Sequence, residues 1–458
     1  MSPRPRRQIR QDPPHEQPVS RRRFLCTTAA LTSGASTAAL VACNPNTTGS
    51  GQQVQPAASK LPPVIVFASS TGQDDLPYFE RYQKWFEEQH PGTKVDLLLP
   101  PGEGSYNTKL LAMFAADTYP DVFHLHFTAV REFWAKGTLH AMDQFIKTHN
   151  APMEDFIPGV MVPYKIKGQT WGLPRDNATG VMYYNEEMLT SNGAQIPTAT
   201  WRWDTDFLDA AKRVTSVPDQ RFGMVFPNIS SIGDQHLEIY RTWGAEWYDA
   251  QMQEARVNSP QAVEAVQFMV DLRMKHHVSP LPGETPSGDQ FQNGWAAMTN
   301  QWQGYVRRVK QSAASFKWNV SPLFRGPQGS KAVNVVGTTG HGIPKGAKNP
   351  EAGFALTLFL LSERVQKDMM SQGRWTTPRK SFLKYALPED GIPTRYQEAI
   401  IDRLAQAQGY ATPVAYAELN QVWRDETAPV WLGQRPVKAA LDAVNVQWDR
   451  LLKQFPSN

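Results

Sequence analysis

The sequence of 458 residues contains only two cysteines, Cys26 and Cys43, and both lie within its first 43 residues. From residue 44 onward there is no thiol pair for a disulfide, no cysteine ligand for a metal and no cysteine nucleophile. The sequence also lacks G-x-S-x-G, H-E-x-x-H, a P-loop, and a G-x-G-x-x-G motif that opens a helix after a strand. We therefore expect no enzymatic activity, no cofactor and no metal. A glycosidase acid and base stay open, because such pairs lie far apart in sequence.

Outside the amino terminus the sequence has no excess of basic over acidic residues. Residues 1–23 carry seven arginines against two acidic residues, residues 24–42 carry no charge, and the remainder has 40 basic and 41 acidic residues. The pI of about 8.8 therefore reflects the amino terminus, and we expect no nucleic-acid binding. Long apolar runs are lacking too: GFALTLFLL at 353–361 is too short to span a bilayer, and we predict a core helix there.

Residues 1–42 have the organisation of an export signal: a basic head, a weakly apolar stretch and small residues before Cys43. The segment SRRRFL at 20–25, with Arg21 and Arg22, resembles a twin-arginine signal. LVAC at 40–43 resembles a lipobox, in which Cys43 is acylated and begins the mature chain. Residues 43–60 are rich in Pro, Gly, Ser, Thr and Gln, which predicts a flexible tether with a reach of roughly 20–24 Å. We expect a protein anchored by lipid on the outer face of the cytoplasmic membrane.

After the tether, strands are expected at 64–68, 95–99 and 122–126, and helices at 77–89 and 106–116. This alternation predicts a parallel sheet covered by helices, with ligands at the carboxyl ends of the strands. The segment 164–189 then reads as an extended crossing between two structured regions. It contains Pro174, which disfavours a helix, uncommitted polar residues at 175–179, and Asn185 as the cap of a following helix.

Eight blocks, in order, resemble the extracellular solute-binding protein family that serves carbohydrate ABC importers, and the order is similar to that of maltose-type binding proteins over about residues 60–450. The blocks are VIVFASSTG, FERYQKWFEEQHPGTKV, YPDVFHLHFTAVREFWAKGTL, WGLPRDNATGVMYYNEEML, IPTATWRWDTDFLDAAKRV, GWAAMTNQWQG, GHGIPKGAKNPEAGFALTLFLLSE and PVKAALDAV. The resemblance implies a two-lobed α/β fold of the type II periplasmic-binding-protein class, with discontinuous lobes joined by hinge crossings.

On this basis we predict a first lobe at 61–178 and 343–375 and a second lobe at 179–342 and 376–458. The three crossings are expected at 164–189, at 338–345 and near 373–378. The implied function is to capture a sugar or oligosaccharide by hinge closure and to present it to an ABC permease in the membrane. We expect the protein to act as a monomer.

A sugar site needs an aromatic plane for stacking and polar side chains for paired hydrogen bonds. Trp302, in the loop expected at 300–305, is the first aromatic candidate. The further ligand-binding candidates are Asp234, Trp247, Ser70, Thr71, His126, Thr128, Asp176, Asn177, Thr179, His341, Trp375, Tyr416 and Glu418.

Alternatives remain for the ligand and for the histidines. An anionic ligand, such as a glycerol phosphate diester, would require arginines such as Arg175, Arg241 or Arg374. An anchored carbohydrate-degrading enzyme, or a receptor that feeds a sensor, would use the same fold differently. His124 and His126 share one side of a strand, and we expect one structural and one hydrogen-bonding histidine rather than a metal site.

Overall fold

The computed structural model describes residues 61–70, 72, 75–99, 103–226, 232, 234–312, 316–371, 373, 375–386, 394–404 and 407–456, without the side chains of 103–105, 234–236 and 328. The predicted export signal, with Arg21 and Arg22, and the predicted tether with Cys43 lie outside these residues. None of the described helices is long and apolar enough to cross a membrane.

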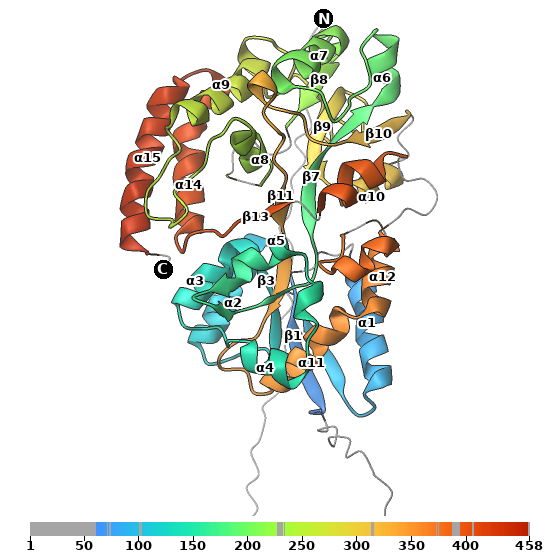
Figure 1. Ribbon diagram of the computed structural model, residues 1–458, viewed down its shortest axis with the longest axis vertical. Coiled ribbons are helices and arrows are strands. Elements are labelled where there is room, and N and C mark those ends of the chain that lie inside the picture. Colours follow the sequence, from blue (N-terminus) through green and yellow to red (C-terminus); the bar gives the residue numbers. More distant parts are fainter. Residues whose placement is uncertain are drawn as a thin grey trace, which may run out of the picture. The chain divides into compact units, whose positions relative to one another are not determined.

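The first sheet has the strand order β2-β1-β3-β12-β6 (Figure 1). Its strands are β1 (Val64–Ala68), β2 (Lys94–Leu98), β3 (Val122–His126), β6 (Leu173–Pro174) and β12 (Thr339–Gly342). The first three pair in parallel, as the alternation of strands and helices predicted, whereas β12 is antiparallel to both β3 and β6. Residues 339–342 therefore belong to the first sheet, which corrects their expected place in the second lobe.

Helices cover the first sheet, whose strand β3 is buried along almost its whole length. Helix α11 contacts β1 and β3, and its Phe354 and Leu356 are buried, so 353–361 lies in a core helix as predicted. Asn349 occupies the N-cap position of α11, but its side chain donates to Asp121 instead of capping. The first-lobe helices and short elements are α1 (Leu76–Gln89), α2 (Glu103–Ala115), η2 (Phe127–Ala129), α3 (Val130–Ala135), α4 (Asp143–Thr148), η3 (Met153–Asp155), α5 (Pro158–Met161), η4 (Val162–Tyr164), the hairpin β4 (Lys165–Ile166) and β5 (Gln169–Thr170), α11 (Pro350–Leu360) and α12 (Glu363–Ser371).

The second sheet has the order β13-β11-β7-β9-β8, with β10 also paired to β7. Its strands are β7 (Ala178–Asn185), β8 (Phe222–Val225), β9 (Ala296–Trp302), β10 (Trp318–Ser321), β11 (Val335–Gly337) and β13 (Gln408–Gly409). Strand β9 continues to Trp302, which pairs with Gly180, so the loop expected at 300–305 begins later. Gly180 cannot carry a side chain, because a Cβ there would lie 2.0 Å from Oε2 of Glu238.

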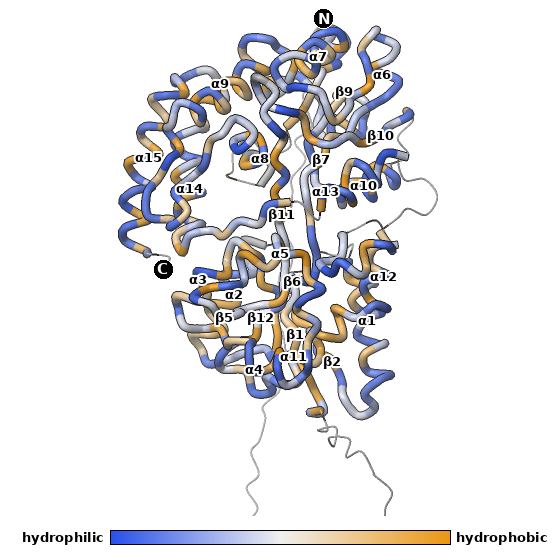
Figure 2. Tube along the Cα trace, in the orientation of Figure 1, coloured by the Kyte–Doolittle hydropathy of each residue, from blue (hydrophilic) through white to orange (hydrophobic). Residues whose placement is uncertain are grey.

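The second lobe has a core rich in tryptophan. Trp203, Trp423 and Trp448 are at most 1% exposed and belong to one apolar cluster. Helices α14 and α15 pack side by side, and α15 alternates hydrophobic and hydrophilic residues along its length (Figures 1 and 2). The helices and short elements of this lobe are α6 (Glu186–Ser191), η5 (Trp203–Phe207), α7 (Leu208–Val214), α8 (Asp234–Thr242), α9 (Pro260–Met274), α10 (Tyr305–Gln311), η6 (Pro327–Gly329), η8 (Gln397–Ile401), α13 (Asp402–Leu404), α14 (Tyr416–Thr427), η9 (Val430–Leu432) and α15 (Val437–Gln454). The short helix η7 (Lys380–Tyr385) contacts α12 of the first lobe.

Candidate functional site: a cavity beside the crossings

Two segments cross between the two sheets, and hydrogen bonds tie them to a third segment near Thr376, the predicted third crossing. The chain leaves β6 at Pro174 and enters β7 at Ala178, and it leaves β11 at Gly337 and enters β12 at Thr339. The third segment, near Thr376, forms a β-bridge with Asn177. The remaining domain boundaries stay a prediction.

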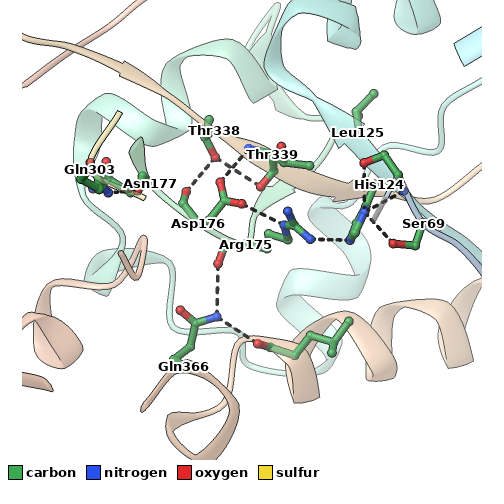
Figure 3. Close-up of polar contacts among 12 residues, drawn as sticks. Ser69, His124, Leu125, Arg175, Asp176, Asn177, Gln303, Thr338, Thr339 and Gln366 are labelled. Atoms are coloured by element: carbon green, nitrogen blue, oxygen red, sulfur yellow. Dashed lines mark hydrogen bonds and ion pairs between the residues drawn. The ribbon is translucent and has the colours of Figure 1, made fainter. Parts of the chain in front are cut away.

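Asp176 joins the first crossing to the second (Figure 3). Its Oδ1 accepts the Thr339 amide at 2.8 Å, and its backbone carbonyl accepts the Thr338 hydroxyl at 2.8 Å. Its Oδ2 accepts Nε of Arg175 at 2.9 Å, and the two side chains are only 6% and 12% exposed. The carboxylate of Asp176 is thus fixed by two charge-assisted hydrogen bonds next to the cavity.

Gln303 joins the first crossing to the third (Figure 3). Its Oε1 accepts the Thr179 amide at 2.6 Å, and its Nε2 donates to the Asn177 carbonyl and, at 2.7 Å, to Oγ1 of Thr376. The side chain is 1% exposed. Since Gln303 directly follows Trp302, the end of β9 is held against two crossings.

His124 lies behind this network with its ring fully buried. Nη1 of Arg175 donates to Nε2 at 2.9 Å, because a guanidinium can only donate. Nδ1 accepts the backbone amide of Ser70 at 3.1 Å and lies 3.0 Å from the Ser69 hydroxyl. Burial, the charge of Arg175 and nearby His341 hold the pKa of His124 well below its ordinary value. The ring is therefore neutral and holds Arg175 in place.

His341 lies opposite His124 in the β3–β12 ladder, with ring centroids 5.5 Å apart. It is 0% exposed, and neither ring nitrogen has a hydrogen-bond partner among the described residues. Burial, and then the charge of Arg175, lower its pKa to about 3. Within the described chain no three His, Cys, Asp or Glu side chains form a group that could hold a metal.

A cavity of about 350 Å³ opens beside the crossings, which is within the usual range for small-molecule sites. Residues from both sheets and from all three crossings line it. They are Ser70, Gly72, Asp75, His126, Phe127, Arg175, Asp176, Ala178, Trp302, Gly337, Thr338, Thr339 and Trp375.

Five predicted residues meet in this cavity: Ser70, His126, Asp176, Trp302 and Trp375. They follow strand ends or lie in crossings, as the sequence argument placed them. Sequence reasoning missed Asp75, Thr338 and Thr339 as cavity residues. Asp75 follows the same strand end as Ser70, and the two threonines begin the predicted second crossing, so the same rule extended by a few residues would have found them.

Other predicted residues lie elsewhere, which corrects their assignment. Trp247 is 3% exposed and packs 4.9 Å from Trp423 in the second-lobe core, because its segment folds back on α15 and not toward the cavity. Asn177, Thr179 and His341 are 0% exposed. Asn177 and Thr179 lie against Gln303, and His341 packs against the ring of His124 in the first sheet.

Three further candidates do not line the cavity. Tyr416 donates to the Ile232 carbonyl at 2.8 Å, and Glu418 is exposed on the same helix. The Thr128 hydroxyl lies 2.7 Å from Nδ1 of His126, so it orients a cavity residue without lining the cavity. Thr71 and the side chain of Asp234 lie outside the described part of the chain.

The family model of the bacterial extracellular solute-binding proteins matches residues 69–367. This chain belongs to that family. The solute-binding protein is similar to a solved ABC substrate-binding protein from Listeria monocytogenes in complex with cycloalternan, with a TM-score of 0.76 and 22% identity over 85% of this chain and 98% of the other. It is also similar to UgpB from Mycobacterium tuberculosis in complex with glycerophosphocholine, with a TM-score of 0.73 and 18% identity over 85% and 98% of the two chains.

Among curated proteins, an arabinooligosaccharide-binding protein from Halalkalibacterium halodurans is 24% identical over 236 residues, half of each chain. The structural likeness confirms the predicted two-lobed type II fold. The family and these neighbours are binding proteins rather than enzymes.

Proposed function

We propose that this solute-binding protein captures a sugar or oligosaccharide in the cavity beside the crossings and delivers it to an ABC permease. The observation that carries the proposal is the meeting of Trp302 and Trp375 with the polar groups of Ser70, His126 and Asp176 in one cavity. Aromatic faces stack on the C–H faces of a sugar, and the polar groups pair with its hydroxyls. The ligand binds most tightly when both lobes contact it, so it favours the closed arrangement.

A neutral ligand fits the charges of the cavity better than an anion does. Arg175 is the one arginine or lysine among the described lining residues, and its guanidinium is already bound to Asp176 and His124. An anion would have to compete with the carboxylate of Asp176 for it. Arg241 pairs with Glu246 and does not line the cavity, and Arg374 lies outside the described residues.

A phosphodiester ligand is the second candidate, because Arg175 lines the cavity and one structural neighbour was solved with glycerophosphocholine. A thermal-shift screen separates the candidates. Ligands that bind only the native state raise the melting temperature, by an amount that grows with concentration. We expect oligosaccharides to raise the melting temperature and glycerophosphocholine to leave it unchanged. The opposite result would favour the phosphodiester over the sugar as the ligand.

The proposed role of Trp302 is tested with the sugar that the screen identifies. Trp302→Ala should weaken its binding by about 10- to 100-fold, the loss of one stacked aromatic, and leave the unfolding of the free protein almost unchanged. Trp295→Ala is the matched control, since Trp295 precedes the same strand at its far end and does not line the cavity. Equal affinity in both variants, or a large loss of stability without ligand in Trp302→Ala, would make Trp302 a packing residue.

The proposal extends to the amino terminus. Export by the twin-arginine segment and acylation of Cys43 would hold the binding unit next to its permease by the tether at 43–60. Substituting Cys43 by Ser should release the protein from the membrane fraction, and metabolic labelling with palmitate should mark the wild type alone. A Cys43→Ser protein that stays membrane-bound and labelled would exclude this anchor.

A further inference from the structure

An ion pair joins the two lobes at the edge of the cavity. Nη1 of Arg307 lies 3.4 Å from Oδ1 of Asp75, and the two side chains are 21% and 17% exposed. Arg307 belongs to α10, whose Tyr305 and Val306 pack in the second-lobe core with β7. Asp75 immediately precedes α1, which packs on the first sheet. The contact therefore connects α10, which packs beside β7 of the second sheet, with the start of α1, which packs on the first sheet, and the two residues are 232 positions apart in sequence.

Asp75 is placed where it would ordinarily serve its own helix. Aspartate at an N-cap position usually accepts a backbone amide of the first turn, but the Asp75 side chain makes no such bond, and Pro77 removes one of the amides. Its carboxylate meets Arg307 instead and lines the cavity. The guanidinium of Arg307 also lies 5.3 Å from the ring centre of Tyr78 in the first turn of α1.

We propose that Arg307, Asp75 and Tyr78 form an electrostatic latch that favours the closed arrangement of the lobes before any ligand binds. The latch runs from α10 to the start of α1 at the cavity residue Asp75, so opening the lobes must separate a partly buried ion pair. A pair of this exposure shifts a two-state equilibrium about two- to fivefold. Salt weakens it, because charges that retain contact with water are screened.

The latch acts without ligand, so its test does not depend on the sugar. The full chain, with Cys26 and Cys43 replaced by Ser, receives spin labels at Lys109→Cys in α2 and Lys212→Cys in α7. Both positions are exposed, one in each lobe. Pulsed electron resonance then gives the distribution of distances between the lobes in the absence of ligand.

We expect Arg307→Glu to move the distance distribution toward longer values, with the closed fraction relative to the open fraction falling at least two- to fivefold. The double variant Asp75→Lys with Arg307→Glu should restore the wild-type distribution, because the reversed charges attract again. Arg308→Glu is the matched control: it makes the same change in charge on the neighbouring, exposed position of α10. It should leave the distances unchanged.

Salt gives an independent measurement. Raising NaCl from 20 mM to 500 mM should lengthen the wild-type distances and leave those of Asp75→Asn unchanged. The latch would be overturned by any of three results. These are distances that do not change in Arg307→Glu, a double variant that behaves like Arg307→Glu, and equal salt responses in wild type and Asp75→Asn. None of these results would refute the proposed sugar site, which is tested separately with ligand and through Trp302.

Discussion

Acid should destabilise this protein through a buried histidine. His341 is 0% exposed, and burial together with the charge of Arg175 lowers its pKa to about 3, whereas a histidine of the unfolded chain has a pKa of about 6.5. Between those values the unfolded chain binds a proton that the folded chain does not. Stability is therefore complete above pH 6.5 and is lost as the pH falls toward 3.

The size of this loss of stability follows from the difference between the pH and the pKa of the histidine in the unfolded chain. A pH of 5.0 is about 1.5 units below the pKa of this histidine in the unfolded chain. Its protonation in the unfolded chain therefore lowers the free energy of unfolding by about 2 kcal/mol. A leucine at position 341 removes this proton and breaks no hydrogen bond, since the ring nitrogens of His341 have no partner among the described residues.

The assay is urea unfolding of wild type and His341→Leu at pH 7.5 and pH 5.0. The difference between the two proteins at pH 7.5 reports packing alone, because the histidine is neutral in both states. At pH 5.0 we expect the unfolding free energy of His341→Leu, relative to wild type, to be about 2 kcal/mol higher than at pH 7.5. A difference that stays the same would show that His341 is protonated in the folded protein, and the reasoning from burial would be refuted.

Two substitutions test the crossings and the core. Gln303→Ala leaves the Thr179 amide without its acceptor and removes one of the two donors to the Asn177 carbonyl, which should cost about 1–3 kcal/mol of stability and speed amide exchange at Thr179. Gln301→Ala, half-buried near the end of β9, is the control, and equal effects of the two would contradict the assignment. Trp247→Ala should cost about 3–5 kcal/mol of stability in urea with little change in ligand affinity per folded molecule, whereas a selective loss of affinity would return Trp247 to the cavity.

The strands and helices of the first sheet could be predicted because their signals are local, whereas the two-lobed fold was implied by the resemblance of the eight sequence blocks. The strands at 64–68 and 122–126 were predicted with their observed bounds, since each is a short apolar run that ends at polar residues. The register between distant segments could not be predicted this way. Strand β12 joins the first sheet by pairing with β3, more than 200 residues away, and the sequence around residue 340 does not indicate which strand it pairs with.

The sequence predicted several residues of the candidate site but not the directions of their side chains. Strand ends and the first crossing located Ser70, His126 and Asp176, because parallel strands present their carboxyl ends at one edge, whereas Trp302 was chosen through the resemblance to the family. The direction of a side chain within a crossing depends on the packing of the other crossings. Asn177 was expected beside Asp176, yet adjacent residues of an extended chain point to opposite sides, and the structure turns Asn177 inward.

The proposed latch changes what a salt-dependent affinity would mean. High salt would weaken the binding of an anion through Arg175, but it would also weaken the binding of a neutral sugar if the closed arrangement depends on Arg307 and Asp75. The two causes separate in Asp75→Asn, which lacks the ion pair and keeps Arg175. A neutral ligand should lose its salt dependence in that variant, whereas an anion bound by Arg175 should keep it. If the affinity for an identified neutral sugar remained equally salt-dependent in Asp75→Asn, then neither the compensated charge of Arg175 nor the latch would describe this cavity.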